Sequence, residues 1–184
     1  MIGLTTGRQT SQRLNSLLKE LAYTLPRARI IRRGKSSIED LAQRLLTEGF
    51  EYAMILQRWH GGPGRIDFYN VTFNGLIPIP PSILLREVKL GREHPSRGRH
   101  SAEAITYGNQ ASKATRTLAT HLSKVFDLPE LSVSTNAGGK TTLHLDESSS
   151  DRSITLAIMT ITGQDVGPRM AISGLIWDLN ESRR

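Results

Sequence analysis

The residues best suited to bind a ligand are the cations of Arg32-Arg33-Gly34-Lys35. They stand directly before Ser36-Ser37-Ile38-Glu39, a sequence that fits the capping box at the start of a helix. Free amides and the helix dipole favour an anion at such a position, and the three cations add to that preference. The segment is therefore a candidate phosphate-binding site. The alternative is a glycine-containing turn whose charges only face water, which is the commoner outcome for an isolated basic cluster.

A second basic segment runs from Arg92 to His100, and it lies in the part of the chain that holds all of the excess positive charge. The first 100 residues contain 16 Lys and Arg against 8 Asp and Glu, whereas residues 101–184 contain 8 against 9. Arginine supplies 18 of the 24 basic residues, and its planar fork of donors suits phosphates and base edges. The net charge of +7 predicts a nucleic-acid partner, although a solvated, heat-adapted surface has the same composition.

We predict RNA contacts in both basic segments and at three further arginines. For one of these, Arg169, the alternative is a structural role as a cap between two halves of the chain. Only ten residues are aromatic, so readout of RNA shape and backbone is favoured over a sheet that stacks bases. The predicted RNA-binding set is Arg32, Arg33, Lys35, Arg58, Arg65, Arg92, Arg97, Arg99 and Arg169.

The sequence offers little for catalysis. The absence of cysteine excludes a thiol nucleophile, a thiolate metal site and disulfides. The five histidines are scattered without a His-Glu-x-x-His pair. Asp146, Glu147 and Asp151 flank a run of serines that is typical of a polar loop. We therefore expect no enzyme activity, cofactor or metal.

One segment, Asn136 to Thr141, invites comparison with a phosphate loop, because glycines precede Lys140 and Thr141. The leading glycine of that motif would stand at position 134, which is Ser134. The residues after Thr141 alternate like a strand, where the motif requires a helix. A turn between strands is the favoured interpretation, and a phosphate-handling enzyme stays as an alternative that a nucleotide-binding assay would test.

The apolar pattern predicts an α/β fold. Leucines at 14, 17, 18 and 21 indicate a helix over 11–24 that Pro26 ends, and similar patterns indicate helices from Ser36 to Gly49 and from Ala114 to Phe126. His60 to Gly64 is expected to be a turn and Pro78 to Pro81 a stiff crossing. No apolar run is long enough for a membrane span, and the N-terminus lacks a cleavable signal. Strands are expected at 28–31, 52–56, 65–72, 83–90, 131–133, 142–145, 154–162 and 170–179.

Several short segments together resemble the Brix domain of ribosome-biogenesis proteins. They occur in the order in which the family has them and cover nearly the whole chain. The sequence departs from the family at Gly7, near Thr10 and at Leu76. The segments are Thr5-Thr6-Gly7-Arg8 with Ser11, Arg13 and Leu14; Arg33-Gly34 with Ile38, Asp40 and Leu41; His60-Gly61-Gly62-Pro63-Gly64; and Val166-Gly167-Pro168-Arg169-Met170.

The resemblance implies a single Brix domain over residues 1–184, with pseudo-symmetric halves of roughly 1–80 and 81–184. Each half would be an α/β unit with mixed sheets and packed helices, similar to the anticodon-binding domain of class II aminoacyl-tRNA synthetases. A faint internal duplication in the sequence agrees with two similar halves. A predicted helix, Leu25-Pro26 and a predicted strand are followed later by a second helix, Leu128-Pro129 and a second strand.

For function, the resemblance implies an archaeal-type protein that binds precursor ribosomal RNA, or a guide RNA, together with a protein partner during subunit assembly. It implies no small-molecule substrate and no membrane contact. The location that it implies is the cytoplasm, or the nucleolus in a nucleated cell. The alternative is a protein-interaction scaffold within a pre-ribosomal particle, with only incidental RNA contact.

Overall fold

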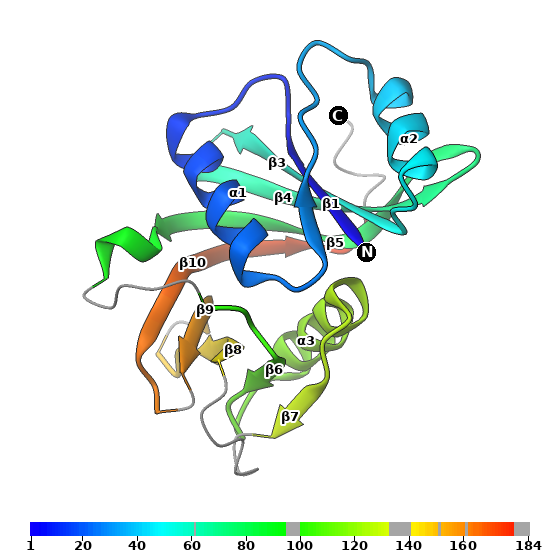
Figure 1. Cartoon of the computed structure of the whole chain (residues 1–184). Coiled ribbons are helices and arrows are strands. Elements are labelled where there is room, and N and C mark those ends of the chain that lie inside the picture. The colour runs from blue at the N-terminus through cyan, green and yellow to red at the C-terminus, as the bar shows by residue number, and fades with distance from the viewer. Residues whose placement is uncertain (61, 95–99, 133–140, 151, 161, 179–184) are drawn as a thin grey trace.

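A computed structural model describes the chain except for residues 61, 95–99, 133–140, 151, 161 and 179–184. The described residues form three α-helices, one 3-10 turn and a single ten-stranded mixed sheet, so the predicted α/β class is confirmed (Figure 1). None of the described helices is long and apolar enough to cross a membrane. In chain order the elements are β1 (Ile2–Thr6), α1 (Gln12–Thr24), β2 (Ala28–Ile30), α2 (Ile38–Thr47), β3 (Tyr52–Trp59), β4 (Gly62–Thr72), β5 (Gly75–Lys89), η1 (Gly91–Glu93), β6 (Ala104–Tyr107), α3 (Lys113–Phe126), β7 (Glu130–Ser132), β8 (Thr141–Glu147), β9 (Ile154–Thr160) and β10 (Asp165–Ile176).

The strand order repeats on the two sides of the sheet. The order is β2-β1-β3-β4-β5-β10-β9-β8-β6-β7, with β5 and β10 antiparallel at the centre. On each side the three outermost strands are parallel to one another, and the next two pairings toward the centre are antiparallel. We expected the halves to meet near residue 80, but this residue lies inside β5. The chain passes from the first side of the sheet to the second between β5 and β6.

The helices cover the sheet unequally. Leucines of α1 and α3 join one large core, in which Phe68 of β4 packs edge-on against His121 of α3 at 5.0 Å between ring centroids. Leu41 and Leu45 of α2 belong to a second core on the opposite face, with Ala53 and Ile55 of β3. β3 is therefore buried on both faces, as its continuous apolar sequence predicts.

Each predicted helix forms within one or two residues of its expected bounds, but the start of α2 corrects our assignment. The N-cap is Ser37, whose hydroxyl accepts from the amide of Asp40 at 3.0 Å, and the Asp40 carboxylate accepts from the Ser37 amide at 3.0 Å. The capping box therefore joins Ser37 to Asp40 and not Ser36 to Glu39. The Ser37 amide and hydroxyl hold the pKa of Asp40 below its ordinary value.

The proline-rich crossing is the second correction, because Pro78 to Pro81 lies inside β5. Among the described strands, this part of β5 pairs with β4 alone, since the pairing with β10 reaches only to Ser82. A proline lacks the amide that a second neighbouring strand would need, so a stretch with one free edge can accept it.

Candidate nucleic-acid interface

The parallel strands bring several separate cations to one edge of the sheet. β1, β2 and β3 run in the same direction, so their carboxyl ends lie together. The last registered pair of β1 and β3 is Thr6 with Leu56, and Arg8 and Arg58 each follow two residues later. The chain leaves β2 through the basic turn that opens α2. We call this set the basic edge, and it consists of Arg8, Arg32, Arg33, Lys35 and Arg58.

Within the described part of the chain, these cations form no ion pair. Arg8, Arg32, Lys35 and Arg58 are exposed, and none pairs with a described carboxylate within 4.0 Å. Arg33 is half-buried, and its Nε donates to the Ser36 carbonyl at 3.2 Å, which fixes the turn. The edge therefore offers positive charge to an outside anion, with Arg33 holding its shape.

Arg65, another residue of the predicted set, is committed to the protein itself. Its Nε donates to the Asp67 carboxylate at 2.6 Å and its Nη2 to the Ser82 hydroxyl at 3.0 Å. Asp67 also accepts from Gln57 and from Ser82, each at 2.5 Å. The guanidinium lies 5.3 Å from the ring centroid of Trp59, and only 12% of the Arg65 side chain is exposed. Arg65 thus stabilises the end of β3 beneath the basic edge.

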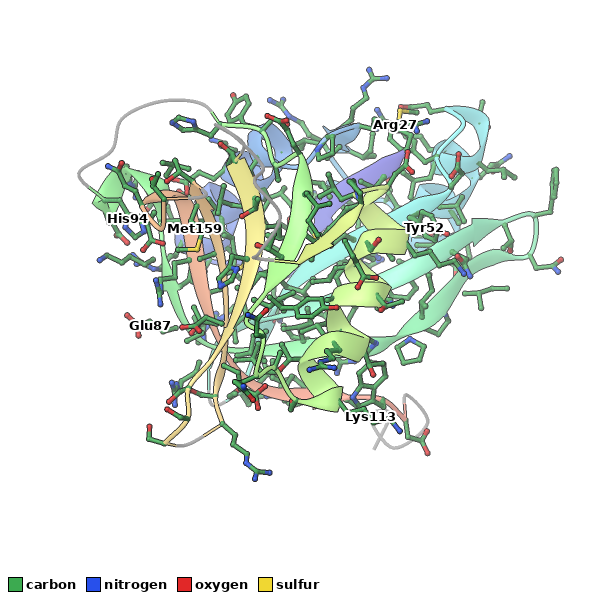
Figure 2. All side chains as sticks on the ribbon, turned by 90° about the horizontal axis from the view of Figure 1, so that it is seen from below. Arg27, Tyr52, Glu87, His94, Lys113 and Met159 are labelled. Carbon is green, nitrogen blue, oxygen red and sulfur yellow. The ribbon has the colours of Figure 1, made fainter. Side chains whose placement is uncertain are left out.

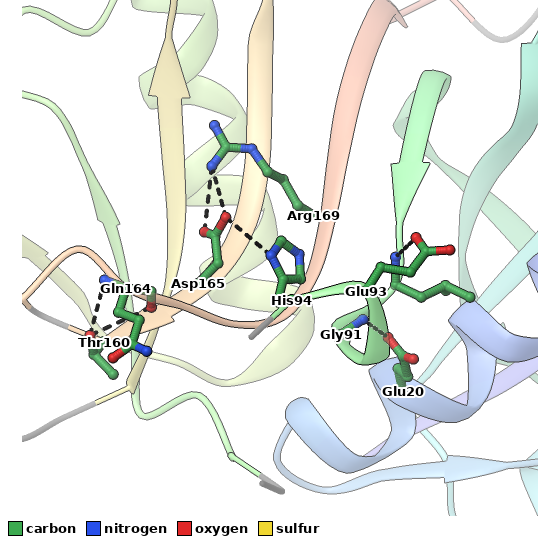
Figure 3. Close-up of polar contacts among 9 residues, drawn as sticks. Glu20, Gly91, Glu93, His94, Thr160, Gln164, Asp165 and Arg169 are labelled. Carbon is green, nitrogen blue, oxygen red and sulfur yellow. Dashed lines mark hydrogen bonds and ion pairs between the residues drawn. The ribbon is translucent and has the colours of Figure 1, made fainter. Parts of the chain in front are cut away.

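The end of β5 leaves the sheet on the same side as the basic edge, because β5 is antiparallel to β4 and β4 to β3. It leads into η1, where Arg92 is exposed. Contacts with α1 hold this turn, since the Gly91 amide donates to Glu20 at 2.7 Å (Figure 3) and the Glu93 carboxylate pairs with Arg13 at 2.7 Å. Arg97 and Arg99 of the predicted set lie outside the described residues.

Arg169 lies on β10 and is engaged in a local contact. Its Nη1 is 3.1 Å from the Asp165 carboxylate, and Nδ1 of buried His94 is 3.7 Å from the same group (Figure 3). The side chain of Arg169 is 38% exposed, so the pair still reaches the surface. The contact joins the residue after η1 to β10 and fits the structural role that we kept as an alternative for Arg169.

The equivalent edge of the second half carries the opposite charge. There β8 ends in Asp146 and Glu147, and the Glu147 carboxylate accepts from the Ser112 amide at 2.8 Å and from the Thr115 hydroxyl at 2.7 Å. These donors hold the pKa of Glu147 below its ordinary value. The start of α3 is thus satisfied by a carboxylate of the chain, whereas α1 starts with only the Ser11 hydroxyl as cap and no acidic residue in its first turn.

The structure also bears on the segment that was compared with a phosphate loop and on possible metal ligands. Thr141 of the phosphate-loop comparison begins the strand β8, as the alternation after it predicts, and the other residues of that segment, 136–140, lie outside the described part. In the described part of the chain, no three His, Asp or Glu side chains gather as metal ligands would.

Comparison with known proteins adds relatives to this geometry. No protein-family model matches the chain. A probable Brix domain-containing ribosomal biogenesis protein of Sulfurisphaera tokodaii is 32% identical over 100 residues, which are 53% of this chain and 57% of that protein. The protein of the same name from Aeropyrum pernix is 32% identical over 90 residues, 49% of this chain and 50% of the relative. The chain therefore spans about half the length of the curated relatives it matches.

Solved structures extend the likeness to the whole fold. A probable ribosomal biogenesis protein from Aeropyrum pernix K1 has a TM-score of 0.72 at 24% identity, covering 95% of this chain and 98% of its own. An archaeal Imp4-like protein has a TM-score of 0.65 at 18% identity, covering 97% of this chain and 100% of its own. Together with the curated relatives, these matches confirm the resemblance of the chain to the archaeal proteins of the Brix domain family.

Proposed function

We propose that this protein takes part in ribosome biogenesis by binding RNA, with precursor ribosomal RNA or a guide RNA as its substrate and a protein partner beside it. The names of the curated relatives support the process, and the basic edge supports the ligand. Exposed cations without described partners contribute most to the free energy of binding a polyanion, because their contacts with phosphates release the counterions of the RNA. The protein acts as a binding factor, and it performs no bond chemistry in this role.

The observation that carries the proposal is the contrast between two equivalent edges. The carboxylate of Glu147 occupies the start of α3, whereas α1 has no acidic residue in its first turn and the cations of the nearby basic edge pair with no described carboxylate within 4.0 Å. A phosphate at the basic edge would take the place that the chain fills for itself in the second half. Arg92 extends this surface, and Arg97 and Arg99 follow it in the sequence. Arg169 and Arg65 are assigned to the contacts that they make with Asp165 and Asp67 within the chain.

The test compares two variants with the same net charge. R32Q/K35Q removes two exposed cations of the basic edge, and K19Q/R86Q removes two exposed cations elsewhere. Each phosphate contact contributes about 0.7–0.9 to the slope of log affinity against log salt, so R32Q/K35Q should lower the slope for a folded ribosomal RNA fragment by about 1.4–1.8. K19Q/R86Q should leave it within about 0.5. Equal slopes for the two variants would refute the assignment of the edge.

A protein-interaction scaffold is a second candidate, which the hairpin of β4 and β5 favours. Residues 70–81 contain no charged side chain, Phe73 at the tip is 94% exposed and Ile77 is 47% exposed. Such an uncharged surface fits an apolar groove on a protein better than it fits RNA. If this surface binds the partner, F73A/I77A should abolish a complex that survives nuclease and high salt while RNA affinity is unchanged.

The finer expectations about the fold and setting are also proposals. We propose that the two sides of the sheet, residues 1–89 and 104–176, each resemble the anticodon-binding domain of class II aminoacyl-tRNA synthetases. Their repeated strand order supports this idea, and a separate structural comparison of each side with those domains tests it. A cytoplasmic location is proposed with the archaeal relatives in view, and fractionation of cells with an antibody to this protein tests it.

A further inference from the structure

A groove lies along the outward face of α3, away from the basic edge. Its described lining comes from α3, from Ala111 two residues before that helix and from Trp177 just after β10, and its volume is about 780 Å³. β10 runs opposite in direction to β5, so Trp177 stands at the edge of the sheet opposite to the basic edge. Figure 2 shows Lys113 at the first turn of α3, where the groove begins.

The described lining of the groove carries positive and no negative side chains. Lys113, Thr117, Thr120 and Lys124 follow one another at spacings of four, three and four residues, which puts them on one helical stripe of about 16 Å. The sequence of α3 contains neither Asp nor Glu, and no carboxylate is among the described residues that line the groove. The buried side of the helix is apolar, so the cations gather on the outward face.

Arg116 and His121 complete the lining in different ways. The Arg116 guanidinium donates to the carbonyls of Ala111 at 3.0 Å and Asn109 at 3.3 Å, which holds it at the start of the helix. Burial, and to a smaller extent Lys124, lowers the pKa of His121 to about 4, so its ring is neutral at neutral pH. The charge of the groove therefore comes from Lys113, Arg116 and Lys124.

Trp177 adds an aromatic side chain to the same lining as these cations. The residue is 41% exposed, one of the few large apolar side chains that the described fold leaves open to solvent. An indole beside a row of cations is the arrangement with which proteins bind single-stranded nucleic acid, because a base stacks on the ring while its phosphates meet the charges. An acidic peptide would use the cations and leave the indole without a matching group.

We propose that this groove binds a single-stranded stretch of RNA, with a base stacked on Trp177 and phosphates on Lys113, Arg116 and Lys124. The inference rests on the proposed RNA-binding function and adds a second contact site, which takes an unpaired segment while the basic edge contacts folded RNA. The two surfaces lie at opposite edges of the sheet, so each can be removed without the other.

The two tryptophans of the chain make a direct test possible, because Trp59 lies beside the basic edge and Trp177 in the groove. W59F leaves Trp177 as the only indole. Its fluorescence should be quenched by an oligoadenylate of about ten nucleotides. Inorganic polyphosphate of similar charge should not quench it. On the W59F background, K113Q/K124Q should weaken the quenching titration, and W177A in the natural chain should weaken oligoadenylate binding about 5-fold to 100-fold.

Each outcome decides between explanations. Quenching that R32Q/K35Q leaves unchanged supports a separate groove site, even if the salt slope for folded RNA fails to respond to R32Q/K35Q. An absence of quenching by oligoadenylate overturns the proposal. Equal responses to polyphosphate overturn base stacking, and tighter binding of polyglutamate than of oligoadenylate assigns the groove to an acidic peptide. K113Q/K124Q changes only exposed side chains, so it reports on the groove even if W177A fails to fold.

Discussion

Arg65 and Asp67 allow a prediction in which stability and RNA binding separate. Asp67 has a side chain only 5% exposed, and D67A would leave the Arg65 guanidinium without its counter-ion and Gln57 and Ser82 without an acceptor. Breaking a buried ion pair on one side costs about 3–5 kcal/mol, and we expect D67A to lower the free energy of unfolding by that amount. R65M/D67L removes both charges and should be at least about 2 kcal/mol more stable than D67A.

Urea denaturation followed by circular dichroism measures these differences, and the same proteins are then titrated with a folded ribosomal RNA fragment. R65M should destabilise the protein but leave the slope of log affinity against log salt unchanged. A slope that falls by about 0.7–0.9 in R65M, with no loss of stability, would show that Arg65 contacts a phosphate. That result would refute the structural role and restore the prediction from sequence.

Three further outcomes test local features of the fold. S37A should lower the free energy of unfolding by about 1 kcal/mol in urea titrations, whereas S36A should change it by less than about 0.5 kcal/mol, since only Ser37 caps α2. G167A should cost about 1–3 kcal/mol in the same assay, because a Cβ would stand 2.7 Å from the Cβ of Ile158. Because the pKa of Glu147 is lowered by folding, its contribution is present above its ordinary pKa and is lost as pH falls through the folded value. The stability difference between the natural protein and E147Q should therefore shrink as the pH of the denaturation series falls below about 4.

Helices and long strands could be predicted because their apolar spacing is regular. α1 and α3 show it directly, with buried leucines at helical intervals. β1 and β6 were missed, since they have five and four residues, and β1 contains Gly3 and two threonines. Their burial comes from neighbours distant in sequence, such as Leu45 of α2, which lies against Gly3. A window of local sequence carries no record of such a neighbour.

The missed strand also explains the omission of Arg8 from the predicted site. Its place beside Arg58 depends on the parallel pairing of β1 with β3, which cannot be seen without β1. Arg65 is the reverse case, a residue of the predicted set that is paired within the chain, and the sequence held a signal of that pairing. Arg65 and Asp67 are two residues apart in a predicted strand, so their side chains share one face and can pair.

Repetition of the strand order creates two edges with the same geometry, and the side chains decide which of them can receive a phosphate. Parallel strands and a following helix offer amides and dipoles at both edges, so backbone geometry alone would favour an anion at each. In the second half Glu147 is that anion, and its hydrogen bonds to α3 leave little for a ligand to gain. In the first half the equivalent position, two residues beyond the last pair with the neighbouring parallel strand, is Arg58 of β3, which pairs with no described carboxylate within 4.0 Å. The charge difference between the halves therefore reflects the source of the anion at each edge, which is a carboxylate of the chain in the second half and a phosphate of the proposed RNA in the first.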